Sequence, residues 1–137
     1  MAKNILICDD AAFMRMMIKD ILTKNGYSVA GEAENGVKAV EKYNETKPDL
    51  VLMDITMPEM DGIEACRVLR SQPEFKQTFM VFLTARSEEY SEIAGFHVGA
   101  DDYIAKPIKP RALMSRINAI LRRNASESSH EPSDKLE

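Results

Sequence analysis

Five residues that follow apolar runs could together bind a metal ion and accept phosphate. Asp9 and Asp10 follow the first run, Asp54 ends another, and Thr84 and Lys106 follow two more. Three neighbouring carboxylates repel one another and need a cation, and their oxygens are ligands that Mg²⁺ prefers. A hydroxyl and an ammonium beside them would neutralise an incoming phosphoryl group. Asp54, at the end of the central run, is the best-placed nucleophile for that group.

Each of these residues taken alone also fits a structural role. An aspartate after a strand is commonly a turn residue or a helix N-cap, which applies to Asp9 and Asp10. Thr84 alone would more often cap a helix, and Lys106 alone would be a solvated surface lysine. The functional interpretation rests on the joint pattern, because complementary groups recur at four strand ends in an order that chance seldom arranges.

The elements that must position these residues alternate along the chain. Short apolar runs predict strands, and the stretches between them carry apolar residues at intervals of three and four, as on one face of a helix. Five such pairs predict an α/β fold, a doubly wound parallel sheet in which ligands bind at the carboxyl ends of the strands. The strands are expected at residues 5–8, 28–30, 50–55, 79–83 and 103–105. Helices are expected at 14–22, 37–43, 63–69, 113–121 and, with the weakest pattern, 90–94.

Composition limits the class of protein. The chain has 137 residues, of which 45% are hydrophobic, and 22 acidic against 18 basic residues give a net charge of -4. One domain with its own core is expected, and the acidic balance argues against nucleic-acid binding by this domain alone. No apolar run suits a membrane span or signal peptide, and two cysteines do not make a disulfide framework. We therefore expect a cytoplasmic protein without membrane insertion.

The C-terminal segment differs in character from the rest of the chain. Residues 1–124 are expected to form the folded domain. Residues 125–137 contain one large apolar residue and are rich in serine and charge. This composition predicts a disordered polar tail, a truncated linker or a vector-derived remnant.

Over about residues 3–123 the sequence resembles the receiver domains of two-component response regulators, of the CheY type. Four motifs carry the resemblance: Asp-Asp at 9–10, Met-Asp-Ile-Thr-Met-Pro-Glu-Met-Asp-Gly at 53–62, Leu-Thr-Ala at 83–85 and Gly-Ala-Asp-Asp-Tyr-Ile-Ala-Lys-Pro at 99–107. The resemblance implies a flavodoxin-like sheet of five parallel strands in the order 2-1-3-4-5, with five helices.

The resemblance also implies roles in phosphate and metal binding. Asp54 would be the phosphoacceptor and, with Asp10 and the backbone carbonyl of Thr56, would ligate Mg²⁺ directly. Asp9 would act largely through a metal-bound water. Lys106 would pair with the phosphoryl oxygens, and the peptide bond that follows it is expected to be cis.

Further residues would control the switch. By the same resemblance, Thr84 is the hydroxyl that moves towards the phosphoryl group, and Tyr103 is the aromatic residue that turns inward behind it. Thr56 and Arg86 occupy the two positions that tune the lifetime of the acyl phosphate. Phosphorylation would thereby change a surface formed by the fourth expected helix (90–94), the fifth strand (103–105) and the fifth helix (113–121), here called helix 4, strand 5 and helix 5.

The two halves of the chain resemble different receivers. Residues up to about 65 are most similar to stand-alone chemotaxis receivers, and residues from about 78 to receivers that precede a winged-helix DNA-binding domain, so a natural mosaic and an engineered chimera both remain open. The DNA-binding subfamily dimerises through helix 4, strand 5 and helix 5. Asp102 and Arg116 match one ion pair of that interface, whereas other expected pairs are missing. A monomer and a phosphorylation-linked dimer are both compatible with this pattern.

The favoured function is a phosphorylation-dependent signalling switch without an independent enzymatic substrate. It would take a phosphoryl group from a histidine kinase or phosphotransfer protein with Mg²⁺ and change its affinity for a downstream protein target. The output is either that of a stand-alone chemotaxis-like adaptor or that of the isolated receiver of a DNA-binding transcriptional regulator.

Two rival classes share parts of this pattern. A flavodoxin-like FMN carrier has the same strand order but needs a phosphate loop rich in Ser, Thr and Gly after strand 1, where this chain has two carboxylates. An aspartyl-phosphate hydrolase usually has a second aspartate two residues after the nucleophile, where this chain has Thr56.

Overall fold

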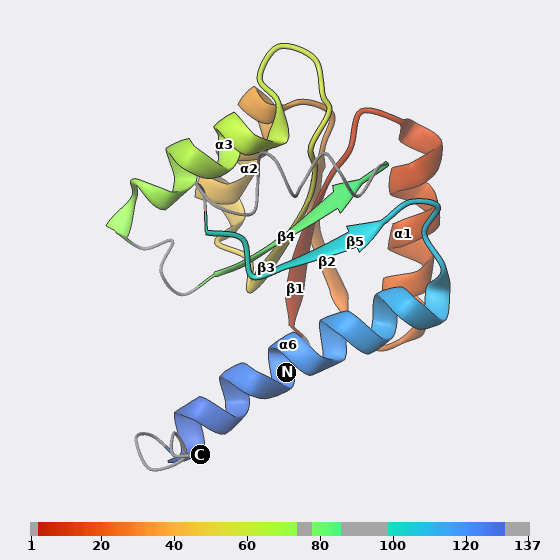
Figure 1. Ribbon diagram of the computed structural model, residues 1–137, viewed down its shortest axis with the longest axis vertical. Helices are drawn as coiled ribbons and strands as arrows, with labels where there is room; N and C mark the ends of the chain where they lie inside the picture. Colours follow the sequence, from red (N-terminus) through yellow and green to blue (C-terminus); the bar gives the residue numbers. More distant parts are fainter. Residues whose placement is uncertain (1–2, 74–77, 86–98, 131–137) are drawn as a thin grey trace. The chain divides into compact units, whose positions relative to one another are not determined.

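The computed structural model describes residues 3–73, 78–85 and 99–130 (Figure 1). In chain order the elements are β1 (Asn4–Cys8), α1 (Ala12–Lys24), β2 (Ser28–Ala33), α2 (Gly36–Thr46), β3 (Leu50–Asp54), α3 (Gly62–Arg70), β4 (Phe79–Thr84), β5 (Asp102–Ala105) and α6 (Pro110–His130). Residues up to Pro107 form one compact unit, and those from Ile108 form a second.

The five strands pair in parallel in the order β2-β1-β3-β4-β5, which confirms the predicted sheet. All five residues of β3 are buried, as expected for a central strand covered on both faces. Four of the five expected helices are described. The helix expected at residues 90–94 lies outside the described residues.

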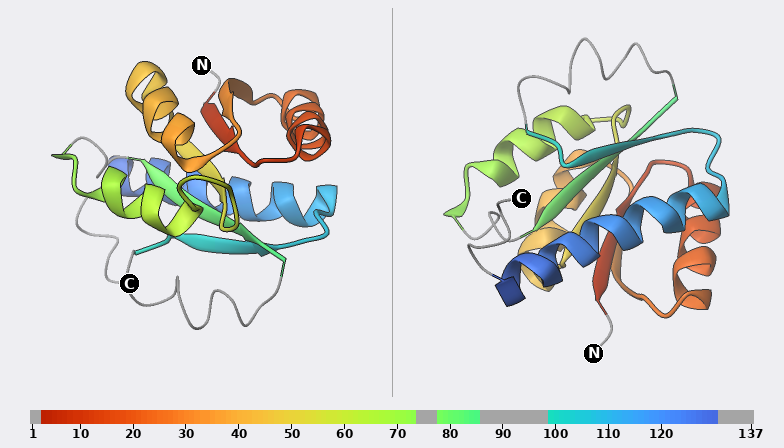
Figure 2. Two further views of the ribbon diagram at one scale, coloured as in Figure 1. Left: turned by 90° about the horizontal axis from the view of Figure 1, so that it is seen from above. Right: turned by 60° about the horizontal axis from the view of Figure 1, so that its bottom comes forward.

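Helices cover both faces of the sheet in the first unit. Figures 1 and 2 show α1 on the side opposite α2 and α3. Because side chains alternate along a strand, each central strand supplies residues to both layers. The layer beneath α2 and α3 is a continuous apolar core that includes Leu6, Val51, Met53, Phe82, Tyr43 and Leu69.

Polar caps begin two of these helices. The Asn35 side chain accepts a hydrogen bond of 2.8 Å from the backbone N–H of Lys38 at the start of α2. The Asp61 side chain accepts one of 2.8 Å from the N–H of Glu64 at the start of α3. Each cap satisfies a backbone donor that the first helical turn leaves unpaired. The caps fix where the loops after β2 and β3 end.

Both cysteines belong to the core, as their positions within apolar runs suggest. Cys8 in β1 and Cys66 in α3 are each 0% exposed. Burial raises the pKa of both thiols, to about 11 for Cys66. Their role in the fold is to fill apolar space.

The second unit contains α6, in which Met114 is buried together with all four residues of the predicted helical pattern: Leu113, Ile117, Ile120 and Leu121. The helix continues to His130, six residues into the segment that the sequence predicts as a tail. The local sequence explains this extension, because no glycine or proline occurs between Arg122 and Pro132 to end a helix. The division of the chain at residue 124 stays a prediction.

Among the helices that the structure describes, none contains an apolar stretch of the length that a membrane span requires.

Candidate functional site

The ends of four strands carry the predicted site residues. Asp9 directly follows β1, Asp54 ends β3, Thr84 ends β4, and Lys106 follows β5. The parallel register places these ends at one edge of the sheet, and the backbone N–H of Lys106 donates a 2.8 Å hydrogen bond to the carbonyl of Thr84. The sheet therefore brings together residues that are far apart in sequence, as the sequence predicts.

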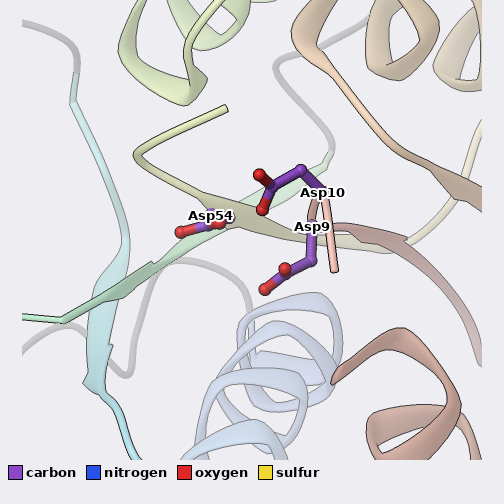
Figure 3. Close-up of side chains that lie close together, drawn as sticks. All are labelled: Asp9, Asp10 and Asp54. Atoms are coloured by element: carbon purple, nitrogen blue, oxygen red, sulfur yellow. The ribbon is translucent and has the colours of Figure 1, made fainter. Parts of the chain in front are cut away.

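Three carboxylates form the centre of the site. Figure 3 shows the side chains of Asp9, Asp10 and Asp54 turned towards a common space. One oxygen from each lies within 4.8 Å of the others. Asp9 and Asp54 are buried, whereas Asp10 is exposed. The cluster thus has a buried base and an open side.

Lys106 supplies a positive charge to the buried side of the cluster. Its Nζ lies 3.0 Å from Oδ2 of Asp9 and 3.3 Å from Oδ1 of Asp54. The peptide bond between Lys106 and Pro107 is cis, which confirms that expectation. One ammonium is thus shared between two carboxylates.

The pKa values of Asp54 and Lys106 are set by burial and by the ammonium group that two carboxylates share. Burial, together with the negative charge of Asp9, raises the pKa of Asp54 to about 6, although Lys106 acts in the opposite direction. Burial lowers the pKa of Lys106, but its close ion pair with Asp9 and the negative charge of Asp54 outweigh this, so that the pKa is raised overall. The carboxylates therefore hold more negative charge than one ammonium neutralises.

The donor set fits a hard divalent cation. Oδ1 of Asp9 accepts a 2.9 Å hydrogen bond from the N–H of Ala11. Oδ2 of Asp9 is buried and, among the described residues, makes no hydrogen bond of regular geometry, so that Lys106 is its ion-pair partner. Carboxylate oxygens around a space with one open side match the way in which proteins bind Mg²⁺.

The loop after Asp54 is held against the end of its own strand. The N–H of Gly62 donates a 2.8 Å hydrogen bond to the carbonyl of Ile55. A Cβ atom at Gly62 would lie 2.1 Å from the carbonyl oxygen of Asp54, so only glycine fits there. Thr56 is exposed in this loop, and its roles as a carbonyl ligand and as a rate-tuning residue stay predictions.

Thr84 and Tyr103 lie beside the site on neighbouring strands. Thr84 is 0% exposed. The partly buried ring of Tyr103 stacks on the ring of Phe82, with centroids 6.1 Å apart and planes at 22°. The switch roles of Thr84 and Tyr103 remain predictions.

Three other predicted residues are not assigned a place in the site by the described part of the first unit. Arg86 lies outside the described residues. Asp102 lies in β5, where its Oδ1 accepts a 2.8 Å hydrogen bond from the N–H of Tyr103. Arg116 is exposed on α6, in the second unit. The proposed output face of Asp102 and Arg116 therefore stays a prediction.

The sequence reasoning missed one residue at the edge of the site. Nη1 of Arg15 donates a 2.7 Å hydrogen bond to the backbone carbonyl of Asp9. A side chain that binds a backbone carbonyl does not require a particular sequence motif. In the sequence Arg15 lies between Met14 and Met16, and it cannot be distinguished there from an arginine on the helix surface. Only its position six residues after Asp9, on the first turn of α1, could have suggested the contact.

Comparison with known proteins identifies the kind of domain that the sequence motifs resemble. The family model of the response regulator receiver domain matches residues 5–118. The chemotaxis protein CheY of Thermotoga maritima is 50% identical over 121 residues, which are 88% of this chain and 98% of that protein. The transcriptional regulatory protein ResD of Bacillus subtilis is 44% identical over 127 residues, which are 93% of this chain but 51% of ResD.

A solved structure shares the fold. The receiver domain of a sensor histidine kinase from Pseudomonas aeruginosa is similar with a TM-score of 0.76 and 30% identity, over 85% of this chain and 94% of that one. That structure has a magnesium ion coordinated in its active-site cleft.

Proposed function

Because the chain belongs to the response regulator receiver domain family, we propose that it is a phosphorylation-dependent switch whose phosphoacceptor is Asp54. One observation carries this proposal: Asp54 shares a site with two further carboxylates and with Lys106, at the carboxyl end of a parallel sheet. The phosphoryl donor is a histidine kinase or a phosphotransfer protein. The domain itself turns over no separate substrate.

We assign the metal site to the carboxylate cluster. Asp10, Asp54 and the backbone carbonyl of Thr56 are the proposed direct ligands of Mg²⁺, and Asp9 is a ligand through water. When bound, Mg²⁺ neutralises charge on the phosphoryl oxygens. The buried Oδ2 of Asp9 and the exposed carboxylate of Asp10 support this assignment, because the first makes no regular hydrogen bond among the described residues and the second is accessible from solvent.

The proposed transfer uses the Asp54 carboxylate as nucleophile. One of its oxygens attacks phosphorus, and the bond from phosphorus to the donor's histidine nitrogen breaks with its electron pair left on that nitrogen. Lys106, already 3.3 Å from Asp54, then pairs with a phosphoryl oxygen. The hydroxyl of Thr84 turns to the new anion, and Tyr103 follows inward.

The downstream partner is a protein that binds the phosphorylated form, and we favour a stand-alone adaptor in the cytoplasm. The similarity to a CheY protein over nearly its whole length supports this output. The receiver of a transcriptional regulator is the second candidate, because nearly all of this chain matches half of ResD. An FMN carrier is disfavoured, since the carboxylates at Asp9 and Asp10 would repel a phosphate that lacks a metal.

The test is mass spectrometry of the intact protein after incubation with acetyl phosphate and Mg²⁺. We expect one added phosphate in the wild type and none in Asp54→Asn. Asp20→Asn, which changes an exposed aspartate of α1, is the matched control and is expected to gain the phosphate. The absence of an adduct in the wild type, or its survival in Asp54→Asn, would refute the assignment.

Oligomeric state is tested on the same samples. Size-exclusion chromatography with light scattering, before and after phosphorylation, distinguishes a monomer from a phosphorylation-linked dimer. A dimer that is lost in Arg116→Ala would support the interface predicted at Asp102 and Arg116.

A further inference from the structure

The polar groups of Asp9 are held from several elements of the fold. Its N–H donates a 3.0 Å hydrogen bond to the carbonyl of Ala33 at the end of β2. Its Oδ1 accepts the hydrogen bond from Ala11, and its carbonyl accepts the 2.7 Å bond from Arg15 of α1. The peptide between Asp9 and Asp10 is therefore fixed by α1 as well as by the sheet.

Arg15 is itself held in place by β2. Its Nε donates a 3.0 Å hydrogen bond to Oε1 of Glu32. The Arg15 side chain is 16% exposed, whereas that of Lys19, which lies 3.6 Å from the other oxygen of Glu32, is 53% exposed. The guanidinium thus bridges a backbone carbonyl and a carboxylate through two separate nitrogens, as its rigid fork of donors allows.

This bridge joins the site to a strand at the edge of the sheet. In the pairing of β1 with β2, Glu32 lies opposite Ile7. Ile7 precedes Asp9 by two residues. The chain leaves the sheet at Asp9 and turns towards the exposed carboxylate of Asp10. A rotation of the peptide between Asp9 and Asp10 would move both carboxylates relative to Asp54.

We propose that Arg15 is a positioning residue of the phosphorylation site, which sets the geometry of the metal-binding carboxylates by holding the Asp9 carbonyl against Glu32. The inference rests on the proposed function, because it concerns the same carboxylates. Arg15 acts through the backbone of Asp9, as groups behind metal ligands commonly do, and such groups affect metal affinity strongly.

The experiment compares Arg15→Gln with Lys19→Gln. Both variants remove one cation that contacts Glu32 from α1, but only the first removes the contact to Asp9. The dissociation constant of Mg²⁺ is measured by calorimetry on folded protein, and the rate constant for phosphorylation by acetyl phosphate is measured at saturating Mg²⁺. We expect about tenfold weaker Mg²⁺ binding for Arg15→Gln. For Lys19→Gln we expect a dissociation constant within about twofold of the wild-type value, since an exposed ion pair contributes little.

Two further variants separate positioning from folding. Arg15→Lys keeps the positive charge but lacks the separate guanidinium donors that contact Asp9 and Glu32 at the same time. We therefore expect its Mg²⁺ affinity to lie between those of the wild type and Arg15→Gln. If Arg15→Gln does not fold, Glu32→Gln leaves Arg15 in place without its anchor, and a smaller loss of Mg²⁺ affinity is expected.

The outcomes distinguish this inference from the proposed function. Wild-type Mg²⁺ affinity in folded Arg15→Gln, with only a lower melting temperature, overturns the positioning role and leaves Asp54 as the proposed acceptor. Equal losses in Lys19→Gln and Arg15→Gln also overturn it. A wild-type protein that binds no Mg²⁺ would overturn both proposals.

Discussion

The ammonium nitrogen of Lys106 lies 3.3 Å from Oδ1 of Asp54, so the proposed acceptor carries an ion pair before any phosphate arrives. The same nitrogen lies 3.0 Å from Asp9. Because one cation serves two buried carboxylates, the site without metal is electrostatically incomplete. Several properties of the protein should depend on that imbalance.

The first prediction concerns stability and pH in the absence of Mg²⁺. The pKa of Asp54 is raised from 3.8 to about 6, mainly by burial and then by Asp9. Between these values the folded state binds more protons than the unfolded state, so the stability contributed by this group falls as pH rises from about 4 to 6. Asp54→Asn should therefore stabilise the protein at pH 7 by on the order of 1–3 kcal/mol.

Urea unfolding in EDTA measures this difference. At about pH 3, where the carboxyl is largely protonated in both states, the gain should largely disappear. Adding Mg²⁺ at pH 7 should stabilise the wild type more than the variant. An Asp54→Asn protein that is less stable than wild type at pH 7 in EDTA would contradict the argument.

The second prediction concerns Lys106. Replacement with methionine leaves Asp9 and Asp54 without their shared cation, so we expect lower stability in EDTA and phosphorylation by acetyl phosphate slowed about a hundredfold. The pKa of Lys106 is raised, so its charge stabilises the fold fully at neutral pH, and this contribution is lost only as pH rises above 10.5. Lys109→Met, at an exposed position three residues later in the sequence, should match wild type in both measurements.

The third prediction compares two glycines. In Gly62→Ala the new methyl group would meet the Asp54 carbonyl at 2.1 Å, so the acceptor strand or α3 must shift. We expect a loss of about 2 kcal/mol or more in unfolding free energy, and slower phosphorylation. In Gly31→Ala the nearest atom is Cδ1 of Leu6 at 3.6 Å, an ordinary contact, so this variant should be neutral or slightly stabilised. Equal losses in the two variants would show that the close approach is not what Gly62 provides.

The fourth prediction separates phosphorylation from the switch. In Thr84→Val the hydroxyl is lost but the shape is kept, so the phosphate adduct should still form. The change that phosphorylation causes at Tyr103 should be lost. Fluorine NMR of protein labelled with 3-fluorotyrosine measures it, with the signal assigned from Tyr103→Phe. Thr84→Ser keeps the hydroxyl and should respond as wild type, whereas a full response in Thr84→Val would remove Thr84 from the switch.

The parts of the fold that could be predicted are those in which burial requires a pattern of apolar residues in the sequence. The run from Leu50 to Asp54 is apolar because both faces of β3 are covered, and its polar last residue marks the strand end. Parallel strands share a carboxyl edge, so finding Asp9, Asp54 and Lys106 after strands was enough to expect them together. The strand order itself came from family resemblance, because neighbours in a sheet leave no periodic signal.

The parts that could not be predicted depend on contacts between distant backbones. The sequence predicts β2 only to residue 30, because Gly31 and Glu32 interrupt its apolar run, but the strand continues to the buried Ala33. Glu32 on this edge strand forms an ion pair with Arg15 of α1. The approach of Gly62 to Asp54 depends on how α3 docks, which the glycine alone does not reveal. Helix α6 exceeds its apolar pattern because nothing in the following residues stops it.

The burial of Cys8 and Cys66 has a consequence for what the protein can sense. A thiol reacts with oxidants and electrophiles mainly as its thiolate, and burial with a raised pKa leaves little thiolate at neutral pH. Cys8 is the residue immediately before Asp9, so an oxidised sulfur there would disturb the site directly. Because both sulfurs are buried, we expect thiol-directed oxidants to leave the phosphorylation site intact in the folded protein.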